Sequence, residues 1–428
     1  MSQETTVLTP AEEAVFARIA WRIMPLLVLA YIINFVDRTN VSVAALTMNK
    51  EIGLSAGQFG FGAGVLFVSY CVFEVPSNLA LYAFGARRWI ARIMVTWGLV
   101  SMAAIWINSP LTFNIQRFVL GAAEAGFFPG VAFYLTLWFP AAYRARIYAW
   151  FLLGVPASAV IGNPLSGLLL ELNGWLGLPG WQWLFLCEGL PAVIVGLVIL
   201  RHLADKPETA SFLSAEEKHL VATRLAREPK EREKRGFWAS VGDIRVLVLA
   251  AIQFTFLIGS YGVGIFLPLI IKGQNFSNLN ASLISAVPSL IACVVMVLWA
   301  RVVDRTGRKI DNLALTNLLS FAGFVLAVAA SSNFLLAMAG LTAVIVGTST
   351  ARAIFWTIPP RFLGGIGAAG ALAFINSVGT IGGFFGPTTM GYAKDLTGSS
   401  NAGLLVLSGF LFLSTLLSLS LKFFVKAE

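Results

Sequence analysis

Long apolar stretches fill most of this chain, and they constrain its fold more than any other feature. An apolar stretch of about 20 residues can cross a bilayer as a helix. An open sheet cannot satisfy its backbone hydrogen bonds in lipid, so each stretch is predicted to be a helix. Twelve such stretches can be placed, at residues 22–46, 57–83, 89–107, 110–139, 143–171, 183–203, 243–271, 279–302, 312–331, 333–356, 365–391 and 401–424. The predicted fold class is an all-α membrane protein with 12 transmembrane helices.

Charge content and charge placement agree with this class. Charged residues make up 12% of the chain and the mean hydropathy is +0.80, whereas soluble domains carry about 25% charged residues. The net charge of +9 could suggest nucleic acid, but the lysines and arginines fall in loops on one side of the predicted bundle. Cytoplasmic loops have this bias. We therefore expect a monomeric, multi-pass protein of a bacterial inner membrane, with both termini cytoplasmic and no nucleic-acid partner.

The sequence offers no pattern for a cofactor or for enzyme chemistry. Cys71, Cys187 and Cys293 lie in apolar stretches without metal-ligand spacing, and His202 and His219 fall in the central polar region. A membrane-embedded enzyme would need paired histidines or a nucleophile within the spans. No GxxxxGK[ST] phosphate loop occurs, so ATP-driven transport has no support. We expect no enzyme and no cofactor, and a protein driven by the proton gradient.

A polar region divides the chain into two halves. Its charges are mixed, and SAEEKHLVATRLA within it predicts a short amphipathic surface helix. We interpret it as a cytoplasmic linker between two six-helix bundles, with a regulatory site as the alternative. The predicted parts are an N-terminus at 1–21, a first bundle at 22–203, the linker at 204–242, a second bundle at 243–424 and a tail at 425–428.

Two pairs of motifs repeat at nearly one spacing. FGARR has its glycine at Gly85 and DRTGRK has its glycine at Gly307, an offset of 307 − 85 = 222. GNPLSG surrounds Pro164 and FGPTTMG surrounds Pro387, an offset of 387 − 164 = 223. Two pseudo-symmetric halves around a site at the bilayer midplane are typical of secondary transporters. We therefore predict conformational roles for eight residues of these motifs: Gly85, Arg88, Pro164, Asp304, Arg305, Gly307, Arg308 and Pro387.

The segment RFVLGAAEAGFFPG places two charges inside an apolar span. Arg117 and Glu124 are seven residues apart, almost two helical turns, so both point the same way, roughly 10 Å apart along the axis. Charges at membrane depth are costly and by default face a cavity with a function. We expect Arg117 to meet an anionic substrate and Glu124 to carry a proton.

The chain resembles the major facilitator superfamily over essentially its whole length. The resemblance rests on twelve spans in two groups of six, the long central loop and DRTGRK after span 8. Ala300 replaces the leading glycine of that loop motif. In the first-half copy, Tyr82 stands at the aspartate position and Ala86 at the first basic position. The first-half loop is therefore expected to lack the aspartate contact proposed to latch the outward-open state.

Five blocks in order resemble the anion:cation symporter family within that superfamily: NFVDRTN, EVPSN, RFVLGAAEAGFFPG, WFPAAYRAR and GWQWLFLCEGLPA. The family's members include transporters of tartrate, phthalate and sugar acids. The resemblance implies that Asp37 and Glu124 are protonatable and that Arg38 and Arg117 bind substrate. It also implies substrate contacts for Trp356 and Asn376. For Trp356, an interfacial aromatic is the alternative.

Asp37 and Arg38 are adjacent on one helix, so their side chains diverge by about 100°. One arrangement sends Arg38 to the cavity and Asp37 toward span 4, near Arg117 or Glu124. A charge pair that only holds spans 1 and 4 together is the alternative.

Predicted spans also contain Glu74, Glu188 and Arg352. For Glu74 and Glu188 we favour structural or gating roles over proton transfer. Arg352 is interpreted as a gate or packing residue and not as a ligand of the substrate.

The predicted function is proton-coupled symport of a small organic anion by alternating access. The substrate is expected to be a carboxylate, such as tartrate or a related hydroxy, sugar or aromatic acid. An anion exchanger, a drug:proton antiporter and a nutrient sensor that does not transport are the alternatives. An apolar cavity with few arginines would suit the antiporter, so Arg38 and Arg117 count against it.

Overall fold

The computed structural model describes residues 9–226, 241–359 and 366–424, which are nearly all helical and contain no strand. The helices of the first half are α1 (Pro10–Glu51), α2 (Ala56–Phe84), α3 (Ala86–Met102), α4 (Pro110–Glu124), α5 (Phe127–Thr136), α6 (Ala141–Leu170) and α7 (Gly180–His202). Those that follow are α8 (Ala215–Ala226), α10 (Ile244–Lys272), α11 (Asn278–Thr306), α12 (Lys309–Ala329), α13 (Phe334–Phe355), α14 (Ile366–Thr397) and α15 (Ser400–Phe424).

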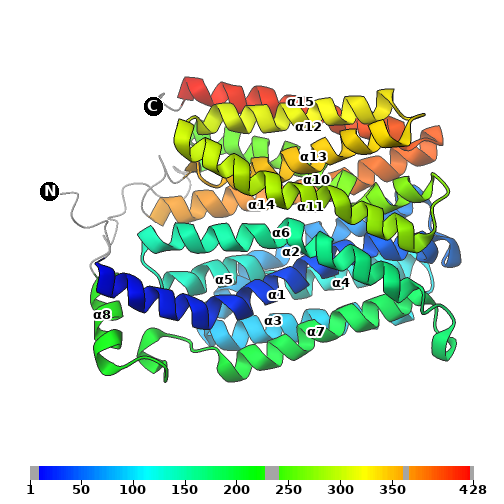
Figure 1. The fold of residues 1–428 in the computed structure, drawn as a ribbon. Coiled ribbons are helices and arrows are strands. Elements are labelled where there is room, and N and C mark those ends of the chain that lie inside the picture. Colours follow the sequence, from blue (N-terminus) through cyan, green and yellow to red (C-terminus); the bar gives the residue numbers. More distant parts are fainter. Residues whose placement is uncertain (1–8, 227–240, 360–365, 425–428) are drawn as a thin grey trace.

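The helices form two bundles that lie side by side with their axes nearly parallel (Figure 1). Within the first bundle α1 packs on α6 and α7, α2 on α4, and α3 on α7. Within the second, α10 packs on α14 and α15, and α12 on α13 and α15. The bundles meet where α2 runs along α14 and α6 runs along α11. We call the end where α1 begins and α15 finishes the terminal end, and the opposite end the far end (Figure 1).

The spans agree with the predicted fold class. Ten helical segments of the described chain are long and apolar enough to cross a membrane. The two further long helices, α6 and α14, lie between these spans at the contact of the bundles (Figure 1). The chain is therefore an all-α membrane protein with twelve spans, six before and six after α8.

Local capping signals explain where the first helices begin. Thr9 and Glu12 form a capping box, and Pro10 occupies the first helical position, so α1 starts well before the predicted residue 22. Ser55 and Gln58 form the same box at the start of α2. These caps satisfy the free N–H groups of the first turn.

Span 4 is not the continuous helix that the sequence predicts. It breaks between α4 and α5 at Gly126, which has a φ of +84°. This left-handed conformation favours glycine, and an added Cβ there would also clash with Ser77 of α2. Glu124 is consequently the last residue of α4.

The contact between bundles depends on close approach of the backbones. A Cβ on Gly60 of α2 would clash with the carbonyl of Pro387 in α14. Near Pro164 in α6, Asn163 donates a 2.9 Å hydrogen bond to Ser285 Oγ of α11. Both prolines predicted to have conformational roles therefore lie in helices that contact the opposite bundle.

The two repeated glycines occupy equivalent turns. Gly85 connects α2 to α3 and Gly307 connects α11 to α12, with φ angles of +86° and +68°. Arg88 is exposed. α8 lies where the sequence predicts a surface helix, and Glu217 on it accepts a 2.5 Å hydrogen bond from Arg18 of α1.

Candidate functional site

A partly open cavity lies between the two bundles, with about 610 Å³ of space free of protein atoms, part of it open to solvent. Helices α1, α2 and α5 of the first bundle and α10, α13 and α14 of the second contribute to its wall. The lining residues are Tyr31, Asn34, Phe35, Arg38, Tyr70, Phe128, Gln253, Phe256, Leu257, Tyr261, Arg352, Trp356, Asn376 and Thr380. Among these described residues the only charged ones are two arginines.

Arg38 lies at the cavity wall and forms a buried ion pair. Its Nε donates to Glu124 Oε2 at 2.7 Å, and the side chains are 9% and 0% exposed. Asn34 Nδ2 donates to the same oxygen at 3.1 Å. The guanidinium also lies 4.6 Å from the centre of the Tyr70 ring. A carboxylate at a helix C-terminus is unfavourable, and Arg38 compensates that charge at the end of α4.

Asp37 points away from the cavity, as expected from its divergence from Arg38, but it does not contact span 4. Its Oδ1 accepts from Ser101 Oγ of α3 at 2.5 Å and from Asn40 Nδ2 at 3.1 Å. No hydrogen bond or ion pair joins Asp37 to Arg117 or Glu124 in the described residues, although both charges lie within electrostatic range of it, and Glu124 is paired with Arg38 instead. Asp37 Oδ2 is buried without a hydrogen-bond partner among the described residues.

Arg117 lies outside the cavity wall. It is 1% exposed, and within the described chain its Nε and Nη1 have no hydrogen-bond partner. It remains within electrostatic range of Glu124 and Asp37. In this conformation Arg117 belongs to a buried charge network behind Arg38 and not to a surface that a substrate can touch, so its predicted substrate role stays a prediction.

Glu74 connects the two bundles at the level of the cavity. Its two oxygens accept from Asn376 Nδ2 at 3.1 Å and from Ser377 Oγ at 3.3 Å, both on α14. Asn376 lines the cavity and at the same time holds an acid of the opposite bundle, and its predicted substrate contact stays a prediction. Glu188 accepts from Ser166 Oγ at 2.6 Å within the first bundle.

Arg352 and Trp356 come from the last turn of α13 and its C-cap. Both line the cavity, and the substrate contact expected for Trp356 stays a prediction. Arg352 was expected to be a gate or packing residue and not a ligand of the substrate, and that role stays a prediction. Four further polar wall residues were missed, namely Asn34, Tyr70, Gln253 and Thr380. The signal for Gln253 is a lone amide within the apolar run of α10.

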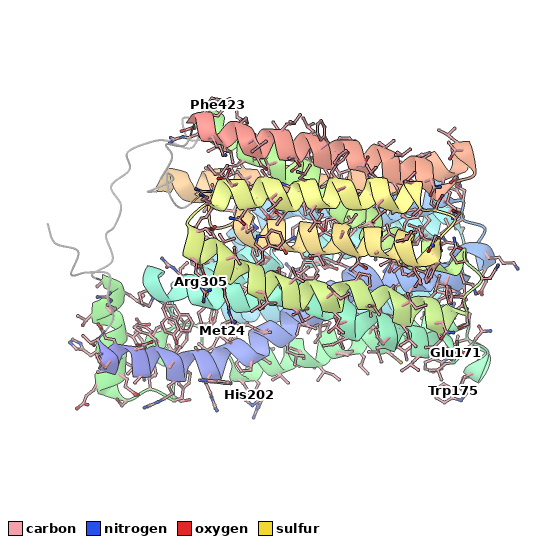
Figure 2. The ribbon with its side chains drawn as sticks, turned by 45° about the horizontal axis from the view of Figure 1, so that its top comes forward. Met24, Glu171, Trp175, His202, Arg305 and Phe423 are labelled. Atoms are coloured by element: carbon pink, nitrogen blue, oxygen red, sulfur yellow. The ribbon has the colours of Figure 1, made fainter. Side chains whose placement is uncertain are left out.

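The far end is closed by a contact between the bundles. Asp395 of α14 accepts from Ser55 Oγ at 2.6 Å, from Gly57 N at 2.8 Å and from Ala56 N at 3.0 Å, all at the start of α2. At the terminal end, the predicted conformational residues Asp304, Arg305 and Arg308 are exposed. Figure 2 shows Arg305 at the terminal end and Glu171 and Trp175 at the far end. Asp304 has no ion pair within the described residues.

Comparisons with known proteins agree with this architecture. Residues 27–387 match the sequence model of the Major Facilitator Superfamily. A protein of Agrobacterium vitis named "Putative tartrate transporter" is 45% identical over 98% of this chain and 94% of its own length. A quinolone resistance transporter of Acinetobacter baumannii is 37% identical over 93% and 92%. A solved D-xylose-proton symporter superposes with a TM-score of 0.75 at 15% identity, covering 93% of this chain and 97% of that one.

Proposed function

Because this chain belongs to the major facilitator superfamily, and is therefore a membrane transporter and not an enzyme, we propose that it takes up a small organic anion together with protons. The observation that carries the proposal is the cavity arginine Arg38, whose guanidinium is held by the fully buried carboxylate of Glu124. An arginine offers a planar fork that binds a carboxylate through two charge-assisted hydrogen bonds. Glu124 currently occupies one donor of that fork.

Proton binding and anion binding are coupled through this pair. When Glu124 takes up a proton, its carboxylate loses the charge that holds Arg38, and the guanidinium becomes available to an anion. When the anion leaves, Arg38 attracts Glu124 again and favours release of the proton. Asp37, buried beside Ser101 with one unpartnered oxygen, is the second proposed proton site. A proton that travels with an anion reduces the charge moved, so the membrane potential no longer opposes uptake.

The names of relatives support a carboxylate substrate. Two proteins of Agrobacterium vitis, each 45% identical to this chain, are named tartrate transporters. The cavity wall adds neutral hydrogen-bonding groups at Asn376, Gln253 and Thr380, which suit the hydroxyl groups of a hydroxy acid. We propose a hydroxycarboxylate such as tartrate.

Alternating access is supported by the contacts at the two ends. With both termini on the cytoplasmic side, as the loop charges predict, the far end faces outward and is closed by Asp395. At the terminal end Asp304 is exposed and forms no ion pair with any described residue. These features fit an inward-facing conformation. We propose that the protein acts as a monomer and needs no cofactor.

Two other transport modes remain as second candidates. The similarity to the quinolone resistance transporter, 37% identical to this chain, supports the first of these, which is export of a drug in exchange for protons. An anion exchanger uses the same arginine without net proton movement. A sensor that binds but does not transport is the third alternative.

Uptake into proteoliposomes separates these functions. With labelled tartrate outside, sodium-free buffer and an inward proton gradient, we expect accumulation that a proton ionophore abolishes. Arg38→Gln should abolish uptake, whereas Arg201→Gln, an exposed arginine at the end of α7, should leave it unchanged. Uptake that needs an internal anion and ignores the ionophore would indicate exchange. Binding without any uptake would indicate a sensor, and proton-driven efflux of a quinolone would indicate export.

A further inference from the structure

The cavity contains a second cation that proton coupling does not use. Arg352 projects from α13 of the second bundle, and its Nη2 donates to Ser260 Oγ at 3.3 Å. Its guanidinium lies 5.7 Å from the centre of the Tyr261 ring. Across the described chain no carboxylate lies within ion-pair distance of Arg352. It also borders a second, smaller cavity that reaches Pro156 and Met296.

The two arginines differ in how their charges are balanced. Arg38 is paired with Glu124, whereas in the described part of the chain Arg352 contacts the hydroxyl of Ser260 and the ring of Tyr261 and forms no ion pair. Glu74, the acid nearest the cavity wall on α2, accepts hydrogen bonds from Asn376 and Ser377 and is not paired with Arg352. A charge inside a membrane protein is costly unless it is paired, so the ligand is the natural partner of Arg352.

Charge counting then indicates the valence of the ligand. Of the described residues that line the cavity, Arg38 and Arg352 carry positive charges, and Glu124 behind the wall balances the charge of Arg38. After Glu124 takes up a proton, two positive charges remain. A dianion would balance both, and a monoanion would leave one arginine unpaired. Because Arg38 lies on α1 and Arg352 on α13, a ligand with two carboxylates would also connect the bundles directly.

We propose that Arg352 determines specificity for dicarboxylates, binding the second carboxylate of a ligand whose first carboxylate binds Arg38. This inference rests on the proposed function and narrows its substrate class. Gln253, buried with Oε1 unpartnered among the described residues, lies in the same wall and accepts a hydrogen bond from a hydroxyl on the chain between the two carboxylates. Monocarboxylates of similar size bind Arg38 alone.

A matched pair of ligands tests the proposal. L-tartrate and L-threonate share a hydroxylated four-carbon chain and differ in one terminal group, a carboxylate in the first and a hydroxymethyl in the second. Binding to the full-length purified protein is measured by calorimetry for wild type, Arg352→Gln, Arg38→Gln and the exposed control Arg201→Gln. We expect wild type to prefer L-tartrate and Arg201→Gln to match it.

The variants should separate the two arginines. Arg352→Gln should weaken L-tartrate binding by about tenfold or more, as loss of a charge-assisted pair predicts, and change L-threonate binding by less than about threefold. Arg38→Gln should weaken the binding of both ligands. If Arg352→Gln does not yield a monodisperse protein, Arg352→Lys replaces it and should lower the tartrate-to-threonate ratio by a smaller factor, since lysine keeps the charge but lacks the fork.

Three results would overturn the proposal. The wild-type protein could bind L-threonate as tightly as L-tartrate. An Arg352 variant could keep the wild-type ratio of tartrate affinity to threonate affinity, or a folded Arg352→Gln protein could lose affinity for both ligands equally. Failure of the proposed function has a different signature, because wild type would then bind neither acid in calorimetry and accumulate neither in proteoliposomes.

Discussion

Asp395 holds the far ends of the two bundles together, so its substitution should shift the balance between conformations. The carboxylate comes from α14 in the second bundle and accepts three hydrogen bonds from the first turn of α2 in the first bundle. This contact can form only when the far ends touch. Asp395→Asn keeps one acceptor oxygen and removes the charge and the second acceptor.

The size of the effect follows from the lost interactions. An anion near an exposed helix N-terminus contributes about 0.3–1 kcal/mol, and a typical hydrogen bond contributes about 0.5–1.5 kcal/mol net. Asp395 is exposed to solvent, so the low end of the summed range applies, about 1 kcal/mol. That corresponds to roughly a fivefold shift in the conformational ratio toward the state open at the far end.

Distance measurements between spin labels test this shift. Trp175 and Leu396 are exposed at the far ends of the first and second bundles and can carry labels after the native cysteines Cys71, Cys187 and Cys293 are replaced. We expect Asp395→Asn to enlarge the population at long distance. Glu171→Gln, an exposed acid at the same end, is the matched control. A distance distribution identical to that of the unsubstituted protein would refute the idea that Asp395 holds the far ends together.

Three further substitutions probe the buried charges. Glu124→Gln should abolish proton-driven uptake and leave substrate-driven exchange at least partly intact in proteoliposomes; loss of binding would argue against a pure coupling role. Arg117→Lys should weaken calorimetric binding if Arg117 meets the substrate, since lysine lacks the bidentate fork, whereas unchanged affinity would fit its place outside the cavity wall and end its substrate role. Glu74→Gln replaces one acceptor with a donor against Asn376, so we expect faster exchange of backbone amides in that part of α14; unchanged exchange would contradict it.

The fold class could be predicted from the sequence because lipid leaves few alternatives. Apolar stretches of this length have to be helices, and the near-equal offsets of Gly85 with Gly307 and of Pro164 with Pro387 indicate two related halves. The break at Gly126 was missed, because a glycine in a span is compatible both with a continuous helix and with the left-handed φ that Gly126 adopts.

The sequence by itself determined which charged residues lie within the membrane spans and in which directions their side chains leave the same helix. It separated Arg38 from Asp37 by the angle between adjacent residues. Only the tertiary structure decided their partners, pairing Arg38 with Glu124 and Asp37 with Ser101, placing Arg117 behind the cavity and Arg352 in its wall. The physical reason is that helical periodicity relates residues within one helix, whereas contacts between helices depend on their packing, rotation and relative height. A contact such as Asp395 with Ser55, 340 residues apart, has no local signature.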